Sequence, residues 1–315
     1  MPSRIRKTIR EGKRFLITSH IDPDGDALGS VFSLYWAMKS LGKEPLVYLK
    51  DRVPYRYDFL PRPADIVHVL PQDAFDAVFV LDCGNLFRVG DGHEHVRSLG
   101  PIVCIDHHDT NEAFGTINVV DTHASSTGEI LYGLYHAMNI DFTYDMAVNI
   151  YTAVFTDTGS LRFENAGVRA FAVCEKMVEA GVRPSDVAGM VYENHPKERF
   201  LLLGEVLRTL RTFDNDRIAF VHITEEMFEK TGTTREQSDG FVEEIKQIRG
   251  VEAAVLIRQA GERRYKISMR AKGTVDVARI CGLWGGGGHK NAAGCHIDGD
   301  LTAVEKELKK AFKIV

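Results

Sequence analysis

Short apolar runs recur along the first half of the chain, and stretches with apolar residues at helical spacing follow the first run and the last. The runs lie at residues 15–19, 46–49, 66–70, 77–81 and 102–105. The runs at 77–81 and 102–105 are continuously apolar rather than alternating, which is typical of strands buried on both faces of a parallel sheet. Apolar residues at helical spacing follow at about 27–41, 130–138, 145–155, 167–181 and 185–192. The pattern predicts an α/β fold in which helices flank a mostly parallel sheet.

The pattern changes near residues 214–216, an Asp-Asn-Asp sequence. A helical stretch at 197–210 precedes this point and is a candidate connecting helix. Beyond it, strand patterns at 218–223, 251–258 and 264–270 mix with short helical patterns, and Gly261 marks a hairpin. We predict a first domain over residues 1–190, a connecting segment over 191–214 and a smaller α+β domain over 215–315.

The composition indicates an ordinary globular protein. Of 315 residues, 44% are hydrophobic and 26% are charged, and the net charge of −5 argues against a generally basic nucleic-acid-binding surface. The five cysteines are scattered without CxxC spacing, which favours reduced thiols. The N-terminal residues lack the apolar core of a signal peptide, and no apolar run approaches the ~20 residues of a spanning helix. We therefore expect a cytoplasmic protein without a membrane segment.

Acidic and imidazole side chains follow three of the apolar runs. His20, Asp22, Asp24 and Asp26 follow the first, Asp82 follows the run at 77–81, and Asp106, His107, His108 and Asp109 follow the run at 102–105. The carboxyl ends of strands are where open α/β sheets collect ligands. Clustered carboxylates repel one another unless a cation neutralises them, and carboxylates with imidazole suit manganese. A structural alternative for the first group is a turn with Asp26 as helix N-cap, but all three together favour a metal site.

Two further motifs follow in the first half. Ser126 and Glu129 are spaced as a helix capping box, which explains them without chemistry, although 125–127 could also contact a ligand. Asp157 lies near the end of a predicted helix, where a carboxylate opposes the helix dipole, so a metal would compensate it. Arg162 is either a phosphate contact or an ordinary surface arginine.

Positive charge gathers in the second half. Residues 251–290 hold eight Lys and Arg against three acidic residues, and this segment ends in four glycines followed by His289 and Lys290. Glycines let backbone amides approach an anion closely, and basic side chains attract phosphates. A solvated hairpin with a flexible loop is the structural alternative. The sequence lacks the GKS or GKT of a phosphate-binding P-loop.

These motifs together resemble the DHH phosphoesterases. The matching motifs are HIDPDGD at 20–26, Asp82 in VLDCGN, the DHH triplet at 106–108, Asp157 in FTDTGS, and GGGGHKNAAG at 285–294, which is similar to the signature of the DHH-associated C-terminal domain. Order, spacing and length resemble the stand-alone nanoRNase/pAp phosphatase (NrnA-type) branch. The resemblance implies a catalytic DHH domain and a C-terminal domain that binds substrate across a cleft.

The resemblance also implies roles for individual residues. Two divalent ions would bind, with Mn²⁺ expected and Mg²⁺ or Co²⁺ as alternatives. His20 and Asp24 would hold the first ion. Asp26, His107 and Asp157 would hold the second ion, and Asp82 would bridge both. Asp106 would orient the imidazole of a metal ligand, and His108 would steady the scissile phosphate or assist the leaving oxygen. Substrate phosphate would be bound by Arg270, His289 and the amides of Gly286, Gly287 and Gly288.

The expected activity is hydrolysis of short single-stranded oligoribonucleotides and of 3′-phosphoadenosine 5′-phosphate (pAp) by water activated between two metals. A phosphodiesterase for cyclic di-AMP or pApA is the alternative within the same fold, because both need the same metals and phosphate contacts. A non-catalytic nucleotide- or RNA-binding module is the alternative from another class, but such a module would not need Asp157 and His108. A homodimer remains open.

Overall fold

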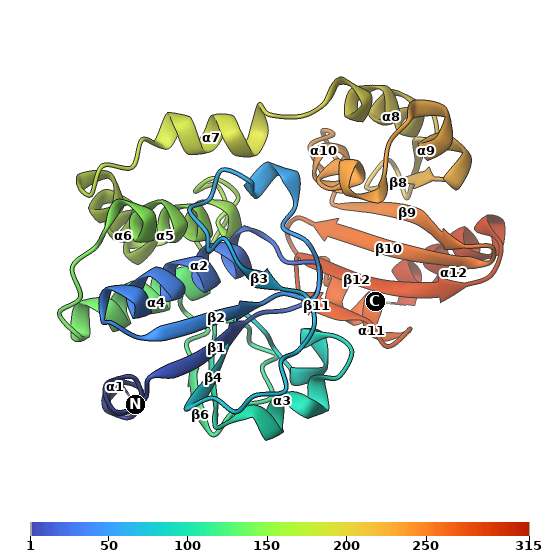
Figure 1. Ribbon diagram of the computed structural model, residues 1–315. Coiled ribbons are helices and arrows are strands. Elements are labelled where there is room, and N and C mark those ends of the chain that lie inside the picture. The colour runs from blue at the N-terminus through green and yellow to red at the C-terminus, as the bar shows by residue number, and fades with distance from the viewer. Residues whose placement is uncertain (1, 315) are drawn as a thin grey trace. The chain divides into compact units, whose positions relative to one another are not determined.

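The computed structural model describes residues 2–314 and divides into two compact units, Met1–Asn194 and His195–Val315. Each unit is built around a six-stranded sheet (Figure 1). The predicted class, a helix-flanked parallel sheet followed by a smaller α+β domain, is confirmed. The predicted boundaries at 190 and 214 stay a prediction, and the helix at Lys197–Leu207 belongs to the second unit.

The sheet of the first unit is parallel throughout, in the order β3-β2-β1-β4-β5-β6. Its strands are β1 (Arg14–Thr18), β2 (Glu44–Tyr48), β3 (Ile66–Val67), β4 (Ala77–Leu81), β5 (Ile102–Asp106) and β6 (Ile117–Val120). All five residues of β4 and all five of β5 are buried, which explains their continuous hydrophobicity.

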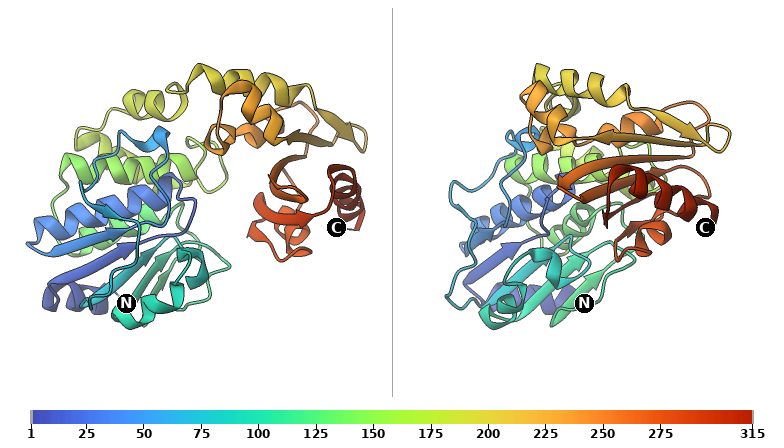
Figure 2. Two further views of the ribbon diagram at one scale, coloured as in Figure 1. Left: turned by 45° about the vertical axis from the view of Figure 1, so that its right-hand side comes forward. Right: turned by 90° about the vertical axis from the view of Figure 1, so that its right-hand side faces the viewer.

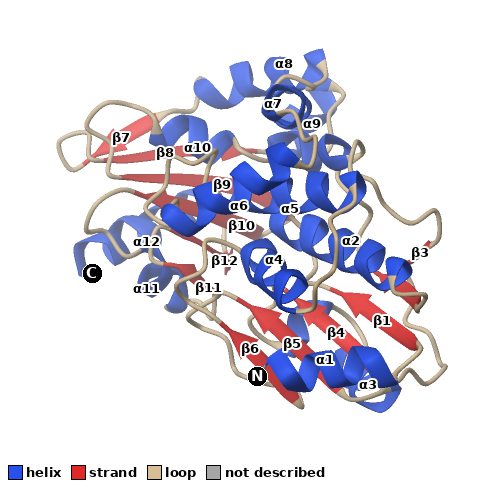
Figure 3. Cartoon of the chain, turned by 90° about the vertical axis from the view of Figure 1, so that its left-hand side faces the viewer, coloured by secondary structure: helices blue, strands red, loops and turns tan. Residues whose placement is uncertain are grey.

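Helices cover both faces of this sheet (Figure 3). The larger core lies beneath α2 (Gly25–Ser40), α4 (Thr127–Ala137), α5 (Tyr144–Asp157) and α6 (Val168–Glu179), to which α1 (Pro2–Glu11) and α7 (Pro184–Tyr192) add buried residues. The other face is covered by α3 (His93–Leu99) and the 3₁₀ helix η2 (Leu86–Val89). A further 3₁₀ helix, η1 (Tyr55–Tyr57), lies in the proline-rich loop.

The sheet of the second unit is mixed, in the order β11-β12-β10-β9-β8-β7. Its strands are β7 (Arg211–Phe213), β8 (Ile218–Ile223), β9 (Ala253–Gly261), β10 (Arg264–Ala271), β11 (Gly287–His289) and β12 (Ala292–Asp298). One face packs on α8 (Lys197–Leu207), α9 (Glu225–Thr231) and α10 (Phe241–Lys246), with η3 (Arg235–Ser238) nearby. The other face packs on α11 (Val277–Gly282) and α12 (Leu301–Ile314) (Figures 1 and 2).

Some predicted elements differ from the structure. The expected strand at 66–70 is only two residues long, and β6, β7, β11, β12 and α3 were not predicted. Within residues 2–314, no helix combines the length and apolar character needed to cross a lipid bilayer.

Candidate active site

The carboxyl ends of β1, β4 and β5 lie next to one another in the first sheet. The strand order reverses between β1 and β4, because the chain adds β2 and β3 on one side of β1 and then returns to its other side. In open α/β sheets, ligands bind in the crevice at such a switch point. The acidic and imidazole groups that follow the three strands are therefore brought to one edge of the sheet.

The turn after β1 is anchored from both sides. Ser19 Oγ donates to the carbonyl oxygen of Leu81 at the end of β4, at 2.7 Å. Asp24, rather than Asp26, is the N-cap of α2, and its Oδ1 accepts from the amides of Asp26 and Ala27. The alternative that makes Asp26 the cap is therefore wrong, and Asp26 stands inside the first turn of the helix.

Asp82 lies between imidazoles on two sides. Its Oδ2 is 3.6 Å from Nε2 of His20, and its Oδ1 is 3.6 Å from Nε2 of His107. Burial acts to raise the pKa of Asp82, but its contact with His20 and the charges of His108 and His107 outweigh burial and lower the pKa well below its usual range. Asp82 is therefore an ionised carboxylate with one oxygen directed to each side.

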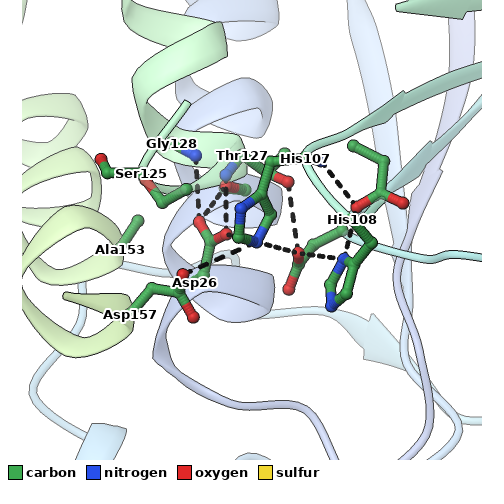
Figure 4. A network of polar contacts seen from close by, with 12 residues as sticks. Asp26, His107, His108, Ser125, Thr127, Gly128, Ala153 and Asp157 are labelled. Atoms are coloured by element: carbon green, nitrogen blue, oxygen red, sulfur yellow. Dashed lines mark hydrogen bonds and ion pairs between the residues drawn. The ribbon is translucent and has the colours of Figure 1, made fainter. Parts of the chain in front are cut away.

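His107 is surrounded by carboxylates (Figure 4). Its Nε2 lies 3.7 Å from Oδ2 of Asp26 and 3.6 Å from Oδ2 of Asp157, the last residue of α5. These separations exceed a normal N–H···O hydrogen bond of about 2.7–3.2 Å. Two ligands that each lie about 2.1 Å from one cation are about 3–4 Å apart. The spacing therefore suits side chains that share a cation.

The electrostatics of these acids also suit a cation. Burial raises the pKa of Asp26 well above its usual value, and the charge of Asp82 adds to the effect. Burial likewise raises the pKa of Asp157, with a contribution from Asp24. Like charges gathered in a low-dielectric site resist ionisation unless positive charge compensates them. Within the first unit, three groups of described residues place their ligand atoms within 4.8 Å of one another, and Asp82 belongs to each of these three. They are His20 with Asp24 and Asp82, Asp26 with Asp82 and His107, and Asp82 with Asp106 and His108.

Asp26 is held in place by the start of α4. Its Oδ2 accepts from the amide of Thr127 at 2.7 Å, and its Oδ1 accepts from the amide of Gly128 at 2.9 Å and from Ser30 Oγ at 3.1 Å. Figure 4 shows Thr127 and Gly128 beside Asp26. A helix N-terminus stabilises a carboxylate, so the first turn of α4 keeps Asp26 oriented.

Asp106 and His108 form a second buried pair. Oδ1 of Asp106 accepts from Nδ1 of His108 at 2.7 Å and from the amide of His107 at 2.8 Å, and its Oδ2 accepts from the side-chain amide of Asn111 at 2.6 Å. Burial lowers the pKa of His108, but the hydrogen bond to Asp106 and the charges of Asp82 and Asp157 outweigh it and raise the pKa to about 10. The imidazole that Asp106 orients directly is therefore that of His108, whereas His107 is contacted through its backbone.

The ring of His20 is oriented by its own loop. Its Nδ1 lies 2.7 Å from the carbonyl oxygen of Ile21, which can only accept, so Nδ1 carries the proton. The amide of Ile21 in turn donates to the carbonyl oxygen of Arg88 at 2.7 Å, which ties the turn to η2. Nε2 of His20 faces Asp82 and is the ring nitrogen that a cation shared with Asp82 would bind. Burial acts to lower the pKa of His20, but the contact with Asp82 and the charge of Asp24 outweigh burial and raise the pKa.

In the sheet of the second unit, Arg270 and His289 lie on either side of the same residue of β12. Both residues are paired across the sheet with Ala292, Arg270 from β10 and His289 from β11. Directly opposed residues share a face of an antiparallel sheet, so these side chains flank the small Ala292 on one face. Arg270 is oriented by Glu243, whose Oε1 accepts from its Nε at 2.7 Å.

The glycine run is a hairpin rather than an open loop. A Cβ atom on Gly286 would lie 2.3 Å from the carbonyl oxygen of Gly294, and one on Gly288 would lie 2.3 Å from that of Ala292. These two glycines are therefore required by close packing of β11 on β12, which is a structural reason for their presence. Gly287 has no such neighbour within 4 Å and is exposed.

Several contacts of the site were not predicted from the sequence. Ser126 is the N-cap of α4, as expected, but the Glu129 carboxylate accepts from Ser125 instead of closing a capping box with Ser126. Thr127 contacts both Asp26 and Asp82, which the capping interpretation did not include. Arg162 is exposed, and its Nε donates to the carbonyl oxygen of Gly159.

Comparison with known proteins agrees with this site. Residues 14–156 match the model of the DHH family, N-terminal domain, and residues 216–315 match the DHHA1 domain. The chain is 33% identical over 307 residues to the bifunctional oligoribonuclease and PAP phosphatase NrnA of Thermus thermophilus, covering 94% of this chain and 90% of that protein. It is 25% identical over 302 residues to the protein of the same name from Bacillus subtilis, covering 94% and 93%.

A solved structure is also similar over nearly its whole length. It is an exopolyphosphatase-related protein from Bacteroides fragilis, with a TM-score of 0.92, 27% identity, and coverage of 99% of this chain and 95% of that one. The fold and the site define a phosphoesterase. The chain belongs to the DHH family and carries its DHHA1 domain.

Proposed function

We propose that this protein is a manganese-dependent phosphoesterase that hydrolyses short oligoribonucleotides and pAp. The observation that carries the proposal is the position of Asp82, an ionised carboxylate with one oxygen toward His20 and the other toward His107. The names of the two NrnA relatives support the choice of substrates.

The residues present fit a pair of divalent ions. His20, Asp24 and Asp82 would hold one ion, and Asp26, Asp82, His107 and Asp157 would hold the other. Their donor atoms are carboxylate oxygens and imidazole nitrogens, which suit Mn²⁺. When bound, two such ions lower the pKa of a water molecule and stabilise charge on the attacking and leaving oxygens. Mg²⁺ or Co²⁺ are alternatives that metal titration would distinguish.

The protein's own groups supply orientation and protons. Nδ1 of His108 is engaged by Asp106, so we propose that this ring contacts a phosphoryl oxygen through Nε2. The hydrogen bond to Asp106 favours a protonated ring, and a charged donor binds a phosphate more strongly than a neutral one. Arg270, His289 and the amide of Gly287 are proposed to bind substrate phosphate in the second unit, with Glu243 holding the guanidinium in position.

Replacement of the shared ligand tests this function. We expect Asp82→Ala to reduce hydrolysis at least about 100-fold, because both ions lose a ligand. The assay measures release of mononucleotide or phosphate from pAp, pApA, cyclic di-AMP and two- to five-residue RNA, with and without Mn²⁺. Asp109→Ala is the matched control, since Asp109 is an exposed carboxylate in the same loop.

The same panel separates the alternatives. Preferential cleavage of cyclic di-AMP or pApA would replace the proposed substrates, and failure of the Mn²⁺-loaded wild-type protein to cleave any of them would favour a binding module. Equal activity of Asp82→Ala and wild type, with both proteins folded by circular dichroism, would contradict the proposed site.

A further inference from the structure

The first turn of α4 contacts two acidic residues that come from different strand ends. The amide of Thr127 donates to Oδ2 of Asp26 at 2.7 Å, and the hydroxyl of the same residue donates to Oδ1 of Asp82 at 3.2 Å. Thr127 is fully buried. One residue therefore links the carboxylate inside α2 to the carboxylate that follows β4.

The hydroxyl of Thr127 is not needed to form the helix. The N-cap of α4 is Ser126, whose Oγ accepts from the amide of Glu129 at 3.1 Å. Thr127 occupies the first helical position, where a side-chain hydroxyl has no capping role. Its hydrogen bond goes instead to Asp82, 45 residues away in the chain.

The contact falls on the oxygen of Asp82 that faces His107. Oδ1 also lies 3.6 Å from Nε2 of His107 and 3.6 Å from Nδ1 of His108, while Oδ2 faces His20. A carboxylate oxygen has two lone pairs, so Oδ1 accepts the hydroxyl hydrogen and still has a lone pair for a cation. A donor fixed to Oδ1 restricts rotation of the carboxylate, which keeps the two oxygens directed to opposite sides.

We infer that Thr127 is a positioning residue that orients Asp82 for binding divalent cations. The inference rests on the proposed function, because it concerns the same pair of cation sites. Partners that hydrogen-bond to a metal ligand typically change metal affinity about 10- to 100-fold when removed. The competing interpretation is that Thr127 only fills space between α4 and its neighbours.

Thr127→Val tests the inference, because valine keeps the shape and removes the hydroxyl. We expect this variant to bind Mn²⁺ about 10- to 100-fold more weakly than wild type. Binding is measured without substrate, by isothermal titration calorimetry and by the electron paramagnetic resonance signal of unbound Mn²⁺. Thr127→Ser restores the hydroxyl and is expected to return most of the affinity, which a purely space-filling role would not produce.

A matched control separates the specific contact from the loss of any buried hydroxyl. Thr152 is also fully buried, and its hydroxyl donates to the carbonyl oxygen of Val148 within α5. Thr152→Val is expected to leave Mn²⁺ affinity unchanged. If Thr127→Val does not fold, Thr127→Ala replaces it in the same titration.

The outcomes separate this inference from the proposed function. Wild-type affinity in both Thr127→Val and Thr127→Ala would overturn the inference and leave the proposed function intact. Weak binding by Thr127→Ser with near wild-type binding by Thr127→Val would favour the space-filling role and overturn the inference too. Equally weak binding by Thr127→Ser and Thr127→Val would show that the hydroxyl does not restore affinity and would also overturn it. A wild-type protein that binds no Mn²⁺ would remove the proposed function and the inference together.

Discussion

Asp82 combines a demanding backbone conformation with a central place in the site. Its φ of 51° lies in the left-handed region, which non-glycine residues rarely adopt, although Asp and Asn do so more readily than most. The amide of Asp82 still donates to the carbonyl oxygen of Ile105, so the ladder between β4 and β5 continues up to this residue. Strain of this kind persists where the surrounding structure holds it, which here means the adjacent strands.

The pair formed by Asp106 and His108 makes a prediction about coupling. If Asp106 acts by orienting and charging His108, Asp106→Asn and His108→Ala each reduce kcat about 10- to 100-fold, and the double variant is no worse than His108→Ala alone. Steady-state kinetics on pAp measures all three. Asp109→Asn serves as the control with an unchanged kcat. Fully additive losses would show that the two residues act independently.

The acidic and imidazole residues of the site were predictable because their chemical type is visible at the end of each apolar run. The groups that orient them were not. Thr127 contacts Asp82 across 45 positions, and the capping-box spacing of its neighbours Ser126 and Glu129 favours a capping interpretation of this segment over a tertiary contact. Similarly, nothing in the sequence distinguishes Asn111 from an ordinary loop residue, yet it donates to Asp106.

Two glycines of α2 allow this helix to pack closely against α5. A Cβ atom on Gly29 would lie 2.4 Å from the carbonyl oxygen of Asn149, and one on Gly25 would lie 2.3 Å from Thr156 Oγ1. These contacts bring the start of α2, which carries Asp26, against the end of α5, which carries Asp157. The glycines therefore set the distance between two of the proposed ligands.

Substitution of these glycines tests the packing. We expect Gly29→Ala to lower the free energy of unfolding by about 1–3 kcal/mol, because the added methyl group meets backbone that cannot move easily. Gly133→Ala is the matched control, since Gly133 lies in α4 with nothing within 4 Å of its Cβ position. It is expected to be neutral or to stabilise by up to about 1 kcal/mol. Urea denaturation measures both, and equal effects would contradict the packing argument.

The segment between α1 and β1 is expected to make the stability of the fold depend on pH. Oδ2 of Asp76 accepts from the amides of Lys13 and Arg14, and these hydrogen bonds lower the pKa of Asp76. A carboxylate with a lowered pKa stabilises the fold above its unfolded pKa of about 3.9, and the contribution is lost as the pH falls through the folded pKa. Because Asp76 is exposed, solvent screening keeps the expected effect of Asp76→Asn near 1 kcal/mol at pH 7.

This prediction is tested by measuring stability at several pH values. The stability difference between wild type and Asp76→Asn is expected to shrink between pH 5 and pH 3, as measured by urea denaturation at each pH. Asp73→Asn removes an exposed carboxylate 3.7 Å from Arg14 and is expected to have little effect at any pH. A difference for Asp76→Asn that stays constant down to pH 3 would contradict the assignment.

Elements with a strong hydrophobic pattern were predictable, and those without one were not. β4 and β5 were predicted from continuous apolar sequence. By contrast, β6 reads INVV with a polar second residue, α3 reads HEHVRSL with only two buried positions, and β11 reads GGH. β6 pairs with β5, and β11 pairs with β12. These two strands therefore form because a neighbouring strand offers hydrogen-bond partners, and their own sequences do not predict them.

Charge is distributed unevenly over the molecule as a whole. The first unit gathers four buried or half-buried aspartates at one site, while residues 251–290 carry an excess of five positive charges. The fold class and this segregation were both predictable, since each depends on composition over long stretches.

Removal of bound Mn²⁺ by a chelator is expected to lower the thermal stability of the protein. Mn²⁺ at about 100 times its dissociation constant stabilises the native state by about 2.7 kcal/mol, which corresponds to a rise in Tm of about 5–10 °C. Differential scanning fluorimetry with EDTA and then with added Mn²⁺ measures the shift. Asp82→Ala is expected to lose most of it. A wild-type Tm that is the same in EDTA and in millimolar Mn²⁺ would argue against a bound cation.

The five cysteines lie in buried positions, and burial raises the pKa of Cys104 to about 12 and that of Cys174 to about 11. The contact with Cys281 lowers the pKa of Cys295, but its thiol is buried like the others. Thiol reagents attack the exposed thiolate, so we expect the buried native thiols to react slowly at neutral pH. A single cysteine introduced at an exposed site, such as Glu94→Cys in one unit or Asp300→Cys in the other, would then take a fluorescent label selectively. Optical measurements on the two units would require no removal of native cysteines.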